Sequence, residues 1–225
     1  MEAPILQQLV RDRAEKRAVV LATRLTDGIQ KLVYPHEKQE ENWLIKAVSQ
    51  VLASDRGAVV EGPDGDWFLN PFNPPLRLIL VGAVHIAQPL ALIGSLAGYD
   101  VTVVDPRTSF ASAERFPDVA LVTDWPDEAM AALAPDARTA IVTLTHDPKL
   151  DDPALHAALR SPAFYVGSLG SKKTHAARVA RLAEAGFTED EIARIHGPVG
   201  LSIGAKSPAE IAISIMAEIT ETLRT

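Results

Sequence analysis

The sequence contains no cysteine among its 225 residues. Without a thiol, the chain cannot form a disulfide, cannot supply thiolates to zinc or to an iron–sulfur cluster, and cannot use a cysteine nucleophile. If the protein handles sulfur, another molecule must carry it. Positive charge is also scarce, because 22 lysines and arginines face 29 acidic residues, for a net charge of -7. Phosphate backbones are bound through Lys and Arg, so we expect no nucleic-acid partner.

Long apolar runs are missing as well. No stretch reaches the 18 residues of a transmembrane helix, and the first residues lack the charged-then-apolar pattern of a signal peptide. We therefore expect a cytoplasmic protein with no membrane span. The chain has no H-E-x-x-H, no His cluster and no G-x-S-x-G, so we assign no metal ligand and no catalytic nucleophile.

The sequence does contain two regions of different pattern. Residues 1–75 predict a small N-terminal α+β domain, with helices at 3–17 and 42–52 and two hairpins that turn at Asp27-Gly28 and Gly62–Gly65. A proline-rich stretch, Pro71–Pro75, marks the boundary between the two domains.

Residues 76–225 alternate between apolar strands and helices, which predicts an α/β domain with a Rossmann-like doubly wound parallel sheet. We predict strands at 76–81, 100–104, 120–122, 139–144 and 164–166, and helices at 86–97, 128–133, 154–159, 172–185, 188–195 and 207–223. Thr188 with Glu191, and Ser207 with Glu210, have the spacing of capping boxes.

The first strand runs into a turn typical of dinucleotide-binding domains. The fingerprint G-x-G-x-x-G/A is only partly met, because Gly82, Val84 and Ala87 occupy its three positions. Val84 places a β-branched side chain where the backbone should approach a pyrophosphate. Asp105 follows Gly82 by 23 residues, which suits a ribose-binding acid or, equally, a turn residue before Pro106.

The segment Gly167–Thr174 predicts an anion site, and the alternative is an ordinary strand-to-helix turn with two solvated lysines. Gly167, Gly170 and Ser171 precede a helix whose first turn carries Lys172, Lys173 and Thr174. Free N–H groups and the helix dipole attract anions there, and lysines are otherwise unfavourable at that end. Ser171 separates the glycine from the lysine, so this is not a P-loop.

Other polar residues also follow strands. His85 and the pair His146-Asp147 do so. The two histidines are candidate acid–base or oxyanion contacts or, equally, structural hydrogen-bonding residues. Arg107 could bind a phosphate or pair with an acid of its own loop. Gly200 and Gly204 belong to a glycine-rich segment, 197–205, that could approach a ligand closely. The remaining histidines (His36, His156, His175 and His196) are expected at the surface or as capping residues.

Five segments together resemble the XdhC/CoxI family, the accessory proteins of xanthine dehydrogenase and carbon monoxide dehydrogenase. They are VGAVHIAQPLA, VTVVDPRTSFASAERFPD, TLTHDPKLDDPAL, FYVGSLGSKKTHAARVARLAEAGF and IHGPVGLSIGAKSPAEIAISIMAEI. The resemblance covers residues 76 to about 220. It implies a chaperone that binds the molybdenum cofactor, a phosphate-bearing pterin that sometimes occurs as a dinucleotide, assists its sulfuration and delivers it to an apo-hydroxylase. It also implies a homodimer and a cysteine desulfurase as partner.

Within that resemblance each candidate residue has an expected role. The 167–174 segment holds the phosphate, Asp105 and Arg107 fix the ribose-like or pterin edge, His85 and His146 face the pterin or metal–oxo group, and the 197–205 segment covers it. The chain departs from the family at Val84, and residues 18–35 lack the family's Gly-Ser-Ser-Pro-Arg-like motif. The Gly-Gly-Cys-x-Glu motif is also absent. An NAD(P)-dependent oxidoreductase and a protein-docking scaffold are the alternatives.

Overall fold

The computed structural model describes residues 2–35 and 42–225, so the prediction for His36 lies outside the described residues. The chain divides into two compact units, residues 1–74 and 75–223. Each unit has its own sheet.

The first unit is an antiparallel sheet with helices. In chain order it contains α1 (Ala3–Ala14), β1 (Val19–Arg24), β2 (Gln30–Val33), α2 (Asn42–Ser54), β3 (Ala58–Gly62) and β4 (Gly65–Phe72). The strand order is β2-β1-β4-β3. Apolar residues of α2, such as Leu44 and Val48, pack with Trp67 and Leu69 of β4 to form its core. Both predicted hairpins are confirmed.

The proline-rich stretch is not wholly a linker, in contrast to the prediction. Pro71 belongs to β4 and lies opposite Val20 of β1. Strand β3 begins opposite Leu69, so Pro71 lies beyond the end of β3 on an edge of the sheet. A residue without an N–H group is tolerated at such a position.

The second unit is a parallel α/β domain, which confirms the predicted fold class. In chain order it contains β5 (Leu76–Val81), α3 (Ala87–Leu96), β6 (Tyr99–Val104), β7 (Ala120–Val122), α4 (Pro126–Leu133), β8 (Thr139–Thr143), α5 (Pro148–Arg160), β9 (Tyr165–Ser168), α6 (Lys172–Glu184), α7 (Glu189–Ala193), β10 (Ile195–His196) and α8 (Pro208–Arg224). The strand order is β10-β9-β8-β5-β6-β7, with every neighbouring pair parallel. This is the Rossmann order, and it reverses between β5 and β8.

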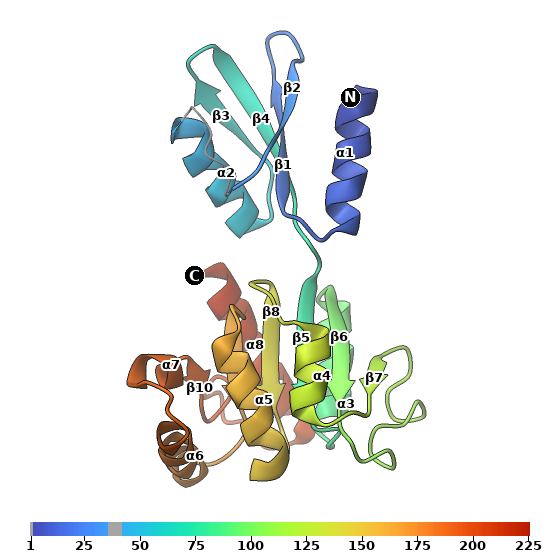
Figure 1. The fold of residues 1–225 in the computed structure, drawn as a ribbon, viewed down its shortest axis with the longest axis vertical. Coiled ribbons are helices and arrows are strands. Elements are labelled where there is room, and N and C mark those ends of the chain that lie inside the picture. Colours follow the sequence, from blue (N-terminus) through green and yellow to red (C-terminus); the bar gives the residue numbers. More distant parts are fainter. Residues whose placement is uncertain (1, 36–41) are drawn as a thin grey trace. The chain divides into compact units, whose positions relative to one another are not determined.

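Helices cover both faces of this sheet. Helices α3 and α8 pack against one face, and α4 and α5 pack against the other together with Leu182 of α6 and Ile192 of α7 (Figure 1). The strands are therefore apolar throughout, as expected for parallel strands buried on both sides. Both predicted capping boxes are present.

Several predicted boundaries differ from the structure by one to three residues, and two differences are more substantial. Helix α5 begins at Pro148, six residues before the predicted start, because Asp147 caps it and Pro148 fits its first turn. Ile195 belongs to a sixth strand, β10, whereas the sequence pattern assigned it to the preceding helix. This strand has only two residues and is defined by its pairing with β9. It is too short for its sequence to show the alternation of apolar and polar residues that is typical of a strand.

Candidate functional site

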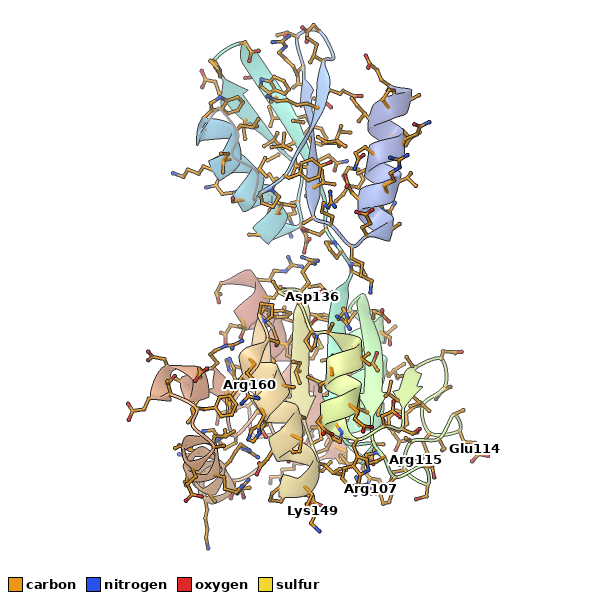
Figure 2. All side chains as sticks on the ribbon, viewed as in Figure 1. Arg107, Glu114, Arg115, Asp136, Lys149 and Arg160 are labelled. Atoms are coloured by element: carbon orange, nitrogen blue, oxygen red, sulfur yellow. The ribbon has the colours of Figure 1, made fainter. Side chains whose placement is uncertain are left out.

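The polar strand ends of the second unit meet along one edge of the sheet. In Figure 2, Arg107, Arg115 and Lys149 lie at the end of the unit where β6 and β8 terminate, and Asp136 lies at the opposite end. Backbone bonds join the loops into one surface, because Leu144 N–H donates to Val81 and Leu169 N–H donates to Thr143. Ligands of doubly wound sheets bind beyond this edge.

The first turn, after β5, is shaped by contacts within the protein. Gly82 has φ +110°, and a Cβ there would lie 2.4 Å from the Thr145 side chain. Ala83 N–H donates to Asp105 at 2.8 Å, and its carbonyl accepts from Arg115 at 2.8 Å. Both backbone groups of Ala83 are thus used by the protein itself.

Asp105 is fully buried and bonded to its own neighbours. Besides Ala83, it accepts from the N–H of Arg107 and, at 2.7 and 2.9 Å, from the guanidinium of Arg107. Burial favours a raised pKa for Asp105, but the hydrogen bonds from Arg107 and Ala83 outweigh it, so the pKa lies below its ordinary value. The pair joins the loops after β5 and β6. Of the two roles considered for Arg107, phosphate binding or pairing with an acid of its own loop, the structure shows the pairing.

Val84 and His85 complete the first turn. The Val84 side chain is partly buried against the core formed with α3 and α8, and His85 is exposed. His85 is therefore accessible to a ligand beyond the edge.

The turn after β8 presents His146 outward. Asp151, in the first turn of α5, is buried and accepts from the hydroxyl and N–H of Thr145 and from the N–H of His146. Burial raises the pKa of Asp151, and these bonds offset that only partly. His146 is exposed and held at φ +63°, and Asp147 caps α5 through the Lys149 N–H. Non-glycine residues held in this conformation cluster at functional sites.

The loop after β9 starts inside the sheet. Gly167 is buried, and a Cβ there would lie 2.5 Å from Val199. Ser168 is fully buried, and its hydroxyl contacts that of Thr143 at 2.5 Å. Gly167 is therefore required by packing between β9 and the segment after β10.

The same loop then becomes exposed at the N-terminus of α6. Gly170 has φ +148° and leads into Ser171, whose hydroxyl accepts from the Thr174 N–H at 3.1 Å. Lys172 and Lys173 are exposed. In the described chain no protein acceptor meets their backbone N–H groups, as is usual for a first helical turn. These donors, the helix dipole and the two lysines form an anion-attracting surface.

The glycine-rich segment 197–205 is anchored at one end only. Val199 N–H donates to Ser168, and Gly200 N–H donates to Glu218 at 2.8 Å. A Cβ at Gly200 (φ +95°) would lie 2.5 Å from Ser214 of α8, whereas one at Gly204 (φ +80°) would meet nothing within 4 Å. The structure thus brings Gly200 against α8 and leaves Gly204 in open space.

Three histidines are not the surface or capping residues that the sequence predicted. His156 is half-buried, with its ring centroid 5.1 Å from that of Phe187, and the other two contact the 197–205 segment or its neighbours. His175 is half-buried and packs so closely on Gly197 that a Cβ there would lie 2.2 Å from its Nδ1 atom. His196 stacks on Tyr165 and lies 3.4 Å from Glu218. Both connect the 197–205 segment to the rest of the unit.

Sequence reasoning also missed Arg178. This residue of α6 is 1% exposed, and its guanidinium donates to the Leu169 carbonyl at 2.8 Å. The available sequence signal was its position one helical turn beyond Thr174. Its burial, however, depends on the tertiary fold.

In residues 2–35 and 42–225, no group of three or more His, Asp or Glu side chains is placed to hold a metal ion. The helices described there are all too short or too polar to cross a membrane. A groove of about 450 Å³ lies between α3 and residues 115–119.

The strand order, the glycine turn after β5 and the polar carboxyl edge define a Rossmann-like, doubly wound α/β domain. The XdhC Rossmann domain matches residues 78–219, so the chain belongs to the XdhC family.

Several relatives share this region. The chain is 32% identical to the molybdenum cofactor insertion chaperone PaoD of Escherichia coli, over 68% of this chain and 43% of that protein. It is 33% identical to a probable xanthine dehydrogenase subunit of Bacillus subtilis, over 70% and 46%, and 34% identical to an uncharacterized Escherichia coli protein, YqeB, over 64% and 27%. The chain thus matches less than half the length of these relatives.

A solved structure shares this fold. A xanthine dehydrogenase of Bacillus halodurans superposes with a TM-score of 0.71 at 24% identity, over 97% of this chain and 63% of that chain.

Proposed function

We propose that this protein is a maturation chaperone that binds the molybdenum cofactor, assists its sulfuration and delivers it to a molybdenum hydroxylase. The cargo would be a pterin with a phosphate, alone or as a dinucleotide, and the hydroxylase would be of the xanthine dehydrogenase or carbon monoxide dehydrogenase type. The relatives include an insertion chaperone and a probable xanthine dehydrogenase subunit, which supports this role.

The observation that carries the proposal is the N-terminus of α6. Its first-turn N–H groups, with Lys172 and Lys173, offer a phosphate several donors and positive charge at the carboxyl edge. His85 and His146 are exposed on loops of the same edge and would contact the pterin or its metal–oxo group. The part of the 197–205 segment around Gly204 has room to approach the cargo.

The chemistry of the donors sets limits on the protein's part. The cofactor supplies its own redox centre, and the chain supplies no thiolate to it, because cysteine is absent. The chain's residues would bind the phosphate and shield the pterin. Sulfur would therefore come from a partner, which we propose to be a cysteine desulfurase.

An NAD(P)-dependent oxidoreductase is the second candidate, because the strand order is that of dinucleotide enzymes. One contact counts against it. The Asp105 carboxylate and the Ala83 N–H, which a dinucleotide would use, are bonded to each other. A protein-docking scaffold is the third candidate. We further propose that the protein acts in the cytoplasm as a homodimer.

The test is retention of purified molybdenum cofactor after gel filtration, together with activation of an apo-hydroxylase. The chaperone should co-elute with the cofactor and increase activation, and Lys172→Glu should weaken both. Absence of retention and of activation would refute the proposal. Binding of NADH in a fluorescence titration, without cofactor retention, would favour the oxidoreductase, and complex formation with the hydroxylase alone would favour a scaffold.

A further inference from the structure

Arg178 is a buried cation for which the fold supplies no ion-pair partner. It is 1% exposed, and among the described residues no Asp or Glu oxygen lies within 4.0 Å of its guanidinium. Its Nε atom is buried without any hydrogen-bond partner. A buried charge ordinarily requires a partner, because desolvation is costly.

The acids on neighbouring elements are committed elsewhere. Asp151 of α5 acts on Arg178 only from beyond ion-pair distance, and its oxygens accept from Thr145 and His146. Asp152 forms a two-bond ion pair with Arg181, at 2.6 and 2.9 Å. Burial lowers the pKa of Arg178, and the distant acids offset this only in part.

The guanidinium lies directly beneath the loop that leads into α6. One nitrogen donates to the Leu169 carbonyl at 2.8 Å, and the same nitrogen would lie 3.6 Å from a Cβ at Gly170. Another lies 3.3 Å from Nδ1 of His175, whose ring packs on Gly197. Arg178 therefore supports the anion-attracting N-terminus of α6 from inside and connects it to the 197–205 segment.

We infer that Arg178 is the charge that selects a phosphate group at the N-terminus of α6, by holding the Gly170 loop in shape and adding a buried positive charge behind it. Because Arg178 is buried, it acts on the phosphate indirectly. It positions the Gly170 loop and attracts the anion electrostatically from behind that loop. The inference deepens the proposed function and rests on it only for the identity of the molecule that carries the phosphate.

Arg181 provides a matched control on the same helix. It has the same charge, lies almost one turn further along α6, and is already paired with Asp152. Removing Arg181 breaks an ion pair without changing the charge beneath the loop. The comparison of Arg178→Met with Arg181→Met therefore separates the role in anion binding from a general effect on the stability of α6.

The experiment measures the binding of inorganic phosphate to the full-length protein by calorimetry, and its thermal stabilisation against sodium chloride of equal ionic strength. The wild type and Arg181→Met should bind phosphate alike. Arg178→Met should lose at least about tenfold in affinity, which corresponds to about 1.4 kcal/mol. Arg178→Lys should retain part of the affinity, because the charge remains, and it answers the question if the Met variant fails to fold.

Two results would overturn the inference: no stabilisation of the wild type by phosphate beyond that by chloride, or equal affinity in Arg178→Met and wild type. The outcomes also separate it from the proposed function. Retention of molybdenum cofactor without any response to phosphate would overturn this inference alone. A phosphate response that depends on Arg178, without retention of the cofactor, would overturn the proposed function alone.

Discussion

Replacing Gly82 with alanine tests why the first turn keeps its glycine. The residue has φ +110°, and a Cβ would lie 2.4 Å from Cγ2 of Thr145 and 3.4 Å from its backbone nitrogen. The structure therefore attributes this glycine to contact between the loops after β5 and β8. The alternative explanation is that Gly82 allows a nucleotide to approach the backbone. In that case the protein itself should tolerate a side chain at residue 82.

The expected cost has two parts. An L residue with a left-handed backbone loses about 1–2 kcal/mol, and overpacking costs about 1–3 kcal/mol, so Gly82→Ala should lose about 2–5 kcal/mol of unfolding free energy. Gly98→Ala is the control, because Gly98 has φ +87° and open space around its Cβ position. It should lose only the backbone part, about 1–2 kcal/mol.

Thr145→Ser isolates the steric part. It removes Cγ2 but keeps the hydroxyl that donates to Asp151 at 2.7 Å. Alone it should cost less than about 0.8 kcal/mol, the value for a fully buried methyl group, because Thr145 is only partly buried. In the Gly82→Ala background it should instead restore stability, giving a coupling energy of at least about 1 kcal/mol in the double-mutant cycle.

The assay is amide hydrogen exchange of β5 and β8 at increasing urea concentrations, because it reports the second unit separately from the first. Costs of Gly82→Ala and Thr145→Ser that add within about 0.5 kcal/mol would refute the steric contact. So would equal losses in Gly82→Ala and Gly98→Ala. Either result would favour the alternative explanation, in which Gly82 allows a ligand to approach the backbone.

Three other substitutions test the same edge. His146→Gly should gain up to about 1 kcal/mol of stability, because it relieves a positive φ, yet weaken cofactor retention on gel filtration; unchanged retention would remove His146 from the site. Asp105→Asn should cost about 1.5–3 kcal/mol near neutral pH. Because the pKa of Asp105 is lowered in the fold, its contribution is present above the ordinary pKa and lost as the pH falls through the folded value, so urea titrations should show a smaller acid loss in the variant than in the wild type. Gly200→Val should destabilise more than Gly204→Val in thermal melts, because both carry the backbone cost of a positive φ but only Gly200 has Ser214 in the space of a side chain; equal losses would contradict the anchoring of the segment at one end.

Much of the second unit could be predicted from local patterns. The strand 76–81 was bounded correctly because an apolar run ends at a glycine turn. The helix after Ser207 was found from its capping box, which satisfies N–H groups within four residues of sequence. Such features depend on neighbours in the chain.

The failures concern features that depend on distant residues. Strand β10 has two residues and is defined by its pairing with β9. Pro71 lies in a strand through its pairing with β1, and a proline is tolerated there because β3 does not extend alongside it. The start of α5 differs, because Asp147 and Pro148 carried the signals of a helix start and the sequence reading used Asp147 only as a site residue.

The candidate site shows the same difference between features set by sequence neighbours and features set by distant residues. Its buried charged residues show this most clearly. Three charged residues of the second unit are buried, Asp105, Asp151 and Arg178, and all three belong to the carboxyl edge. The two acids accept hydrogen bonds from loops of this chain, so the fold satisfies them without a ligand. Arg178 differs, because one of its nitrogens has no partner and no acid pairs with it in the described chain. This contrast between two satisfied buried acids and a buried cation without an ion-pair partner supports our inference that Arg178 acts on an anion bound at the N-terminus of α6.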